Sequence, residues 1–121
     1  MSANVATLKV AHGPLLGPVL ARVVGMLAAR AHCPVDRLDD ALLVADAIAA
    51  HAPGHSPDGH VIVRVGAGED GIELEVLGLR TGGGDALMAD AALPGVGNVL
   101  ERIADEVRVS GEGVAVRLAL G

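Results

Sequence analysis

Asp46 and Ala50 lie four residues apart in a stretch whose apolar pattern predicts a helix. Residues at this spacing share one face of a helix, so their side chains can act on the same ligand. A carboxylate such as that of Asp46 could serve as a general base. Ala50 has no ligand atom, although Mg²⁺ requires oxygen ligands in octahedral geometry. Asp46 is therefore the candidate catalytic residue, and the competing interpretation is a solvated carboxylate on the polar face of a helix.

Two glycine-rich segments could bring backbone N–H groups close to a phosphate. The first is 82–84, which follows an expected strand, and the second is 95–97, which precedes an expected helix. Free N–H groups at a helix start form an anion site in principle. The competing interpretations are a mobile surface loop for the first segment and an ordinary turn with an N-cap for the second. The candidate cofactor-binding residues are Gly82, Gly84, Gly95, Gly97 and Asn98.

The cysteine and the histidines predict no further site. Cys33 is the only cysteine, which excludes an internal disulfide, and we interpret it as structural or incidental. His51, His55 and His60 are near one another in the sequence, but their spacing matches no standard zinc pattern and no cysteine accompanies them. We therefore predict no metal site.

The composition argues against several classes of partner. The chain has no Phe, Tyr or Trp, its formal net charge is −6, and Lys and Arg do not cluster. It therefore offers neither a stacking surface for bases nor a basic patch for phosphates, and we expect no nucleic-acid partner. Arg22 and Asp46 interrupt the apolar stretches, and residues 1–4 lack the start of a signal peptide. We expect a cytoplasmic protein with no membrane partner.

Hydrophobic periodicity predicts the elements that must position these residues. Alternation predicts five strands, over residues 5–10, 60–65, 72–77, 106–109 and 114–120. Three- and four-residue spacing predicts helices over 15–31, 35–52 and 97–104, with a weak helical turn over 85–92. This order predicts an α+β fold, a two-layer sandwich with helices packed on one face of a mixed, mostly antiparallel sheet. The length suits a single domain over residues 1–121.

Two segments resemble motifs of a known protein family. The stretch from Asp39 to Ala52 resembles the second-helix motif of the anti-sigma-factor serine kinases, which belong to the histidine-kinase-like (GHKL, Bergerat-fold) ATPase superfamily. The stretch from Gly95 to Val107 resembles that family's later glycine box, in which a G-x-G turn opens a helix that runs into a strand. The opening strand, the long helix after it and the chain's ending also fit. The resemblance spans nearly the whole chain and implies a Bergerat-like domain.

The resemblance also implies that residues for nucleotide binding are missing. In the family, an acidic residue on the second helix activates a water or hydroxyl, an Asn ligates Mg²⁺, and an Asp accepts a hydrogen bond from adenine. The resemblance places Asp46, Ala50 and Gly78 at these three positions, so the last two lack the required side chain. The segment 85–94 is also short for the family's ATP lid. A degenerate site with no or weak binding of ATP and Mg²⁺ is therefore expected.

Three functions are compatible with these residues. The first is a degenerate anti-sigma-factor-kinase-like module in transcription regulation, which acts by protein–protein binding to a sigma factor, an anti-anti-sigma protein or a second copy. The alternative is an active ATP-dependent protein serine kinase, an anti-sigma factor with unusual ligands in which Asp46 is the base. The third is a phosphotransfer protein, which would need a phosphorylated histidine. The apolar content of 51% agrees with an apolar surface that a homodimer covers.

Overall fold

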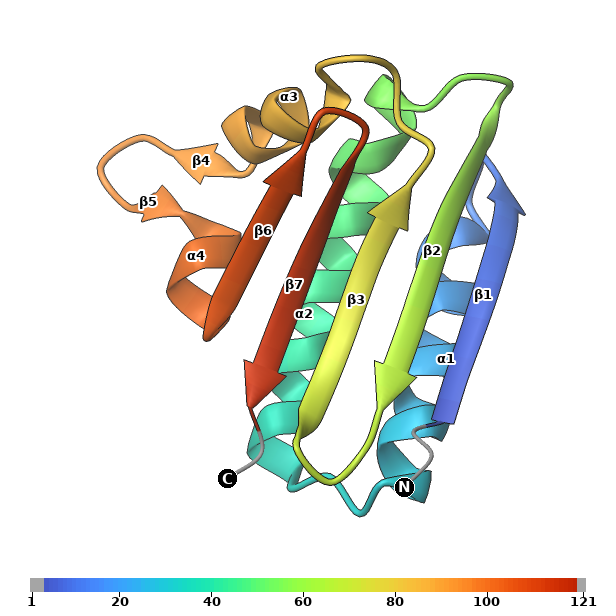
Figure 1. Ribbon diagram of the computed structural model, residues 1–121, viewed down its shortest axis with the longest axis vertical. Coiled ribbons are helices and arrows are strands. Elements are labelled where there is room, and N and C mark those ends of the chain that lie inside the picture. Colours follow the sequence, from blue (N-terminus) through green and yellow to red (C-terminus); the bar gives the residue numbers. More distant parts are fainter. Residues whose placement is uncertain (1–3, 120–121) are drawn as a thin grey trace.

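Five strands form one antiparallel sheet in the computed structural model, which describes residues 4–119 (Figure 1). The strands lie in the order β1-β2-β3-β7-β6, and each neighbouring pair is antiparallel. Their bounds are β1 Asn4–Ala11, β2 His60–Ala67, β3 Gly71–Leu77, β6 Glu106–Ser110 and β7 Gly113–Ala119. Short turns join β2 to β3 and β6 to β7, and short turns of this kind connect antiparallel neighbours. Leu120, the expected end of the last strand, lies outside the described residues.

Two long helices cover one face of the sheet (Figure 1). They are α1 (Leu16–Arg30) and α2 (Val35–His51), and they pack against each other. On α1, the buried residues Leu20, Val24 and Leu27 repeat at spacings of four and three residues. This spacing gives an apolar stripe on one side of a helix, so the sequence pattern and the buried face agree.

The chain between β3 and β6 forms a small layer beside β6 (Figure 1). It contains α3 (Gly83–Asp90), the strands β4 (Ala92–Leu93) and β5 (Gly97–Asn98), and α4 (Val99–Ile103). Strands β4 and β5 form a hairpin, whose turn has Pro94 at its second place and Gly95, with a φ of +75°, at its third. These positions define a type II turn. Because the hairpin includes residues 97 and 98, the helix expected from residue 97 begins two residues later.

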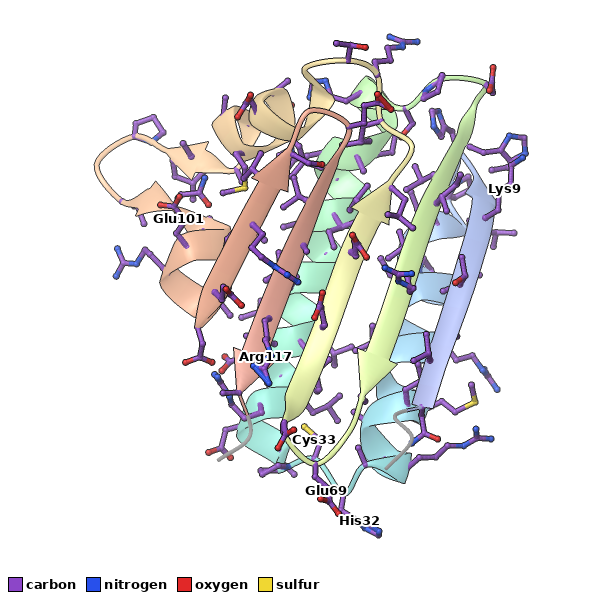
Figure 2. All side chains as sticks on the ribbon, viewed as in Figure 1. Lys9, His32, Cys33, Glu69, Glu101 and Arg117 are labelled. Carbon is purple, nitrogen blue, oxygen red and sulfur yellow. The ribbon has the colours of Figure 1, made fainter. Side chains whose placement is uncertain are left out.

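The two faces of the sheet carry different side chains. Toward the helices, alternate residues of the central strands are apolar and buried, namely Val61, Val63, Val65, Ile72, Leu74, Val76, Val114, Val116 and Leu118. Charged residues such as Arg64, Glu73 and Arg117 alternate with them on the opposite, open face, on which Figure 2 labels Arg117. This arrangement confirms the α+β two-layer fold expected from the sequence, with helices on one face of the sheet. No helix within residues 4–119 is long and apolar enough to cross a membrane.

Candidate functional site

Asp46 lies on the exposed side of α2. Arg37 lies instead on the side of the helix that is buried with Val44, and its guanidinium contacts Asp105 between α4 and β6. Nine residues separate Arg37 from Asp46, which is about two and a half helical turns, so their side chains leave the helix in opposite directions. Ala50, one turn further along, is exposed as well. A role of Asp46 as a catalytic base therefore stays a prediction.

The first glycine segment is closed against the turn between β6 and β7. Gly82 has a φ of +80°, and its N–H donates to the carbonyl oxygen of Gly111 at 2.9 Å. A Cβ built on Gly84 would lie only 2.1 Å from the carbonyl oxygen of Ser110. Glycine is therefore required at both positions by the backbone itself. Phosphate binding by Gly82 and Gly84 stays a prediction.

The second glycine segment leads into a helix start whose N–H groups are occupied. The Oδ1 atom of Asn98 accepts hydrogen bonds from the N–H groups of Leu100, at 2.9 Å, and Glu101, at 3.2 Å. The N–H of Val99 donates to the carbonyl oxygen of Ala91 at 3.0 Å. The first three N–H groups of α4 are thus paired within the chain, although such groups are the usual donors to an anion. Asn98 is the N-cap of α4, which agrees with the interpretation of this segment as an ordinary turn with an N-cap.

Asn98 also links α4 to α3. Its Nδ2 atom donates to the carbonyl oxygen of Met88 at 2.7 Å. The preceding Gly95 and Gly97 have φ values of +75° and +94°, which residues with a side chain rarely adopt. All three residues therefore have a structural role in the hairpin and the helix start, and binding of a cofactor by them stays a prediction.

Apolar side chains occupy the region between α2 and the two glycine segments. The exposed fractions of Leu79, Leu87 and Leu100 are 3%, 0% and 0%. These leucines belong to the same hydrophobic core as Val44 and Ile48 of α2. A ligand pocket for a nucleotide needs open space and convergent polar groups. In this conformation the region is instead a part of the core.

An ionic cluster that the sequence did not indicate joins three distant elements. The Arg37 side chain on α2 donates to Asp40 at 2.9 Å, to Asp105 and, through Nε, to the carbonyl oxygen of Ala119 at 2.8 Å. The N–H of Ala119 in turn donates to Asp105 at 2.7 Å. This backbone hydrogen bond, together with the nearby Arg37 charge, lowers the pKa of Asp105. Arg37 and Asp105 are 68 residues apart, so no local pattern could have revealed the pair.

A histidine–aspartate pair fastens the end of α2 to α3. His55, in the short 3₁₀ helix η1 (Ala52–His55), places its Nε2 atom 2.6 Å from Oδ2 of Asp90. The carbonyl oxygen of His55 also accepts the N–H of Arg80 at 2.8 Å. These two contacts join η1 to α3 and to the start of the glycine-rich connection. Among the described residues, no group of three or more His, Cys, Asp or Glu side chains is arranged to hold a metal ion.

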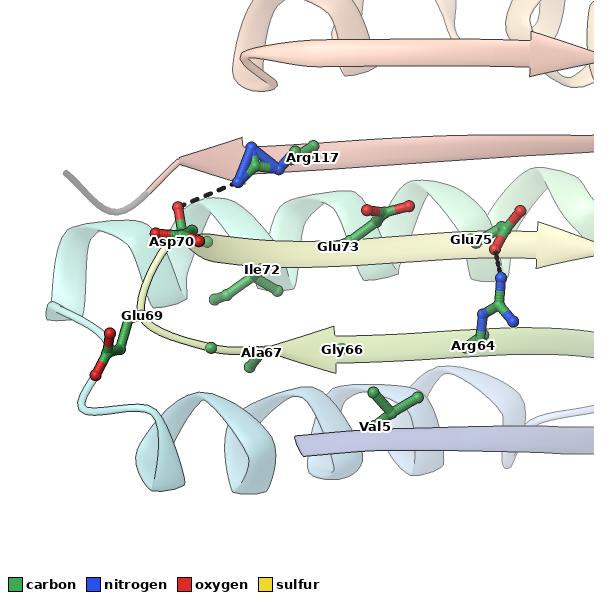
Figure 3. A pocket seen from close by; sticks show the side chains of 12 residues that line it. Val5, Arg64, Gly66, Ala67, Glu69, Asp70, Ile72, Glu73, Glu75 and Arg117 are labelled. Carbon is green, nitrogen blue, oxygen red and sulfur yellow. Dashed lines mark hydrogen bonds and ion pairs between the residues drawn. The ribbon is translucent and has the colours of Figure 1, made fainter. Parts of the chain in front are cut away.

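The open face of the sheet has a hollow of about 540 Å³ near the β2–β3 turn (Figure 3). Its charged lining residues are Arg64, Glu69, Asp70, Glu73, Glu75 and Arg117. Arg64 pairs with Glu75, and Arg117 donates to the carbonyl oxygen of Asp70 at 3.5 Å. Carboxylates outnumber guanidinium groups in this lining, so a polyphosphate would be repelled rather than attracted. The charge of this lining therefore does not favour a nucleotide in the hollow.

Comparison with known proteins supports the fold. No protein-family model and no curated protein matches the chain. The solved structure of the RsbU and RsbW domains of Rv1364c from Mycobacterium tuberculosis is similar to 96% of this chain, with a TM-score of 0.60 and 12% sequence identity. This chain spans 32% of the length of that solved chain. At such low identity the similarity shows a shared fold, and it says nothing about activity.

Proposed function

We propose that this chain is a degenerate relative of the anti-sigma-factor kinases that regulates by binding another protein, with no or weak affinity for ATP and Mg²⁺. The paired N–H groups at the start of α4 carry the proposal, since Val99, Leu100 and Glu101 all donate within the chain. A phosphate bound there would first have to displace the Asn98 cap. Loss of such a cap typically costs about 0.5–2 kcal/mol.

Two further features support weak or absent nucleotide binding. Leu87 and Leu100 are fully buried in the region that adenine and ribose would need. Ala50 has no oxygen with which to ligate Mg²⁺. The chain has the two-layer fold that the resemblance implies, but it lacks the side chains that would ligate Mg²⁺ and bind adenine. This combination favours a role in protein binding. The resemblance to anti-sigma-factor kinases points to a sigma factor or an anti-anti-sigma protein as the partner.

Thermal unfolding with and without Mg-ATP tests the nucleotide part of the proposal. A ligand that binds the native state raises its stability by mass action, so the midpoint should stay unchanged if ATP does not bind. Ala50→Asn supplies the missing ligand atom. Because the N–H groups at the start of α4 stay paired within the chain in this variant, it should show no gain either. A midpoint that rises with Mg-ATP concentration in the unsubstituted chain would overturn the proposal.

Size-exclusion chromatography with candidate partners tests the binding part. A sigma factor or an anti-anti-sigma protein from the same genome should co-elute with the chain in the absence of nucleotide. Transfer of labelled phosphate from ATP to such a partner, abolished by Asp46→Asn, would instead establish the kinase alternative. The proposed class of partner would be contradicted if no sigma factor and no anti-anti-sigma protein of that genome co-eluted with the chain.

A further inference from the structure

Gly66 lies inside β2 although the fold does not require a glycine at this position. It pairs with Val5 of β1 and with Glu73 of β3 in continuous registers, so β2 has no bulge there. Gly66 is not among the glycines with a positive φ, and a Cβ built on it would lie 3.6 Å from Cγ2 of Val5, which is an ordinary contact. A glycine inside a strand weakens the strand, and without a bulge it often marks the close approach of a ligand or of another chain.

Two other glycines of the sheet are explained by the fold itself. A Cβ built on Gly71 would lie 2.5 Å from the carbonyl oxygen of Leu118, and one built on Gly113 would lie 2.6 Å from that of Val76. These two glycines make room for a neighbouring strand. Gly66 instead makes room on the open face of the sheet, in the lining of the hollow near the β2–β3 turn.

The hollow combines an apolar wall with carboxylates (Figure 3). Val5, on the β1 side of Gly66, is 58% exposed and offers an apolar surface. Glu73 lies on the β3 side, and Glu69 and Asp70 of the β2–β3 turn line the end of the hollow. A long side chain lying over Gly66 would therefore have apolar contacts along its length and carboxylates near its tip.

The lining stays acidic after its internal ion pairs are taken into account. Arg64 is paired with Glu75, and Arg117 lies in register between two glutamates of the neighbouring strands. Glu69 and Asp70 belong to none of the ion pairs found within residues 4–119. A hollow whose unpaired charges have one sign attracts groups of the opposite sign. The complementary ligand is therefore a cation.

We propose that this hollow is a docking site for a basic segment of another protein, with a lysine or arginine side chain lying over Gly66. Such a side chain has an apolar stem, which would lie against Val5, and a cationic head, which would reach the carboxylates of the turn. The hollow is open and adjoins a second one of about 310 Å³ that shares part of its lining, so a chain can lie across the sheet. The proposal rests on the proposed function for the role of the partner, and it adds the chemistry of the partner's contact segment.

Gly66→Val fills the hollow without changing any charge. Because valine favours strands and glycine weakens them, the variant should unfold at the same urea concentration as the parent chain or at a higher one. Gly71→Ala is the matched control and should unfold at a lower concentration, since its Cβ would meet the carbonyl oxygen of Leu118. A destabilised Gly66→Val would show that the fold itself requires the glycine, which would overturn the proposal.

Titration with a defined peptide tests the binding. The probe is a short peptide in which arginine alternates with alanine, and the control peptide has glutamine in place of arginine. The arginine peptide alone should change the NMR chemical shifts of the amides around Gly66 and Gly71. Gly66→Val should bind it at least about tenfold more weakly, because the added side chain overpacks the site. No binding to the parent chain, or equal affinity for the two chains, would overturn the proposal.

A pair of charge variants separates this site from a general attraction to an acidic protein. Asp70→Asn removes a carboxylate of the hollow and should weaken binding of the arginine peptide about twofold to fivefold, as expected for an exposed ion pair. Glu112→Gln removes the same charge from the β6–β7 turn, at the other end of the sheet, and should leave the affinity unchanged (Figure 1). Equal effects of the two variants would overturn the site. Tighter binding of spermine than of the peptide would show a site for small cations instead of a docking surface.

A partner found by co-elution distinguishes this proposal from the proposed function. A partner that binds the parent chain but not Gly66→Val would support both. A partner that binds both chains equally would leave the regulatory function standing and overturn the docking site. If no candidate partner co-elutes, the proposed function fails, whereas the peptide titration still decides whether the hollow binds a basic segment.

Discussion

Gly84 lies against Ser110 so closely that no side chain fits between them. A Cβ built on Gly84 would be 2.1 Å from the carbonyl oxygen of Ser110, and 2.6 Å from that of Gly113. These atoms belong to the backbone of the β6–β7 turn and cannot rotate away. The contact fixes the start of α3 on the sheet, and it explains a glycine that the sequence offered as a phosphate ligand.

Gly84→Ala should therefore destabilise the protein. Overpacking typically costs about 1–3 kcal/mol, and here the obstructing atoms are backbone. Gly25→Ala is the matched control, since Gly25 lies inside α1 with no atom within 4 Å of the added Cβ. Alanine in an open helix position is favoured over glycine by about 0.5–1 kcal/mol. Urea unfolding should show opposite signs for the two variants, and a neutral Gly84→Ala would contradict the close contact.

Asn98→Ala should weaken the link between α3 and α4. The substitution removes the cap on Leu100 and Glu101 and the hydrogen bond to Met88. Loss of the cap alone costs about 0.5–2 kcal/mol, so the thermal midpoint should fall. Asn98→Asp keeps a capping oxygen but loses the donor to Met88. Its thermal midpoint should therefore lie between those of the parent chain and Asn98→Ala. A thermal midpoint of Asn98→Ala equal to that of the parent chain would contradict this role of Asn98.

The carboxylate of Asp105 should contribute to the acid sensitivity of the fold. The N–H of Ala119 and the Arg37 charge lower the pKa of Asp105 in the native state. A lowered native pKa gives stability that is present above the unfolded value, about 3.9 for Asp, and that is lost as pH falls through the native value. Asp105→Asn removes this titration and should flatten the loss of stability in that range. If the thermal midpoints of the parent chain and of Asp105→Asn depended on pH in the same way, this role of Asp105 would be contradicted.

Cys33 should react slowly with alkylating reagents at neutral pH. Burial raises the pKa of this thiol, against a smaller opposing effect of the Arg37 charge. Because the thiolate is the reacting form, a raised pKa lowers the rate. Figure 2 shows Cys33 next to His32 in the turn between α1 and α2. Iodoacetamide labelling of the native chain should be slower than that of the urea-unfolded chain, and equal rates would show that the site does not perturb the thiol.

Much of the fold could be predicted from local sequence patterns. The five strands and the two long helices follow the periodicities of two and 3.6 residues, since burial of one face imposes these periods on the sequence. The hairpin of β4 and β5 was not predicted, because two-residue strands are too short to show alternation. Pro94 and Gly95 are the central residues of its turn.

The candidate site was harder to predict than the fold. The four-residue spacing of Asp46 and Ala50 placed them correctly on one face of a helix. It could not show whether that face would meet the glycine segments, because this depends on how distant parts of the chain pack. In the structure both residues are exposed on α2. The contact of Arg37 with Asp105, 68 residues away, is another feature that no local pattern contains.

The sequence by itself determined the five strands of the main sheet, the two long helices, their apolar faces and the absence of polar side chains at Ala50 and Gly78. These properties are local, since each depends on the identity of a residue and its near neighbours. Only the tertiary structure decided that Gly84 meets backbone atoms of the β6–β7 turn, that the first N–H groups of α4 are already bonded, and that β1 is an outer strand of the sheet. Those facts depend on which distant segments come together, and hydrogen bonding and close packing are satisfied only when the whole chain has folded.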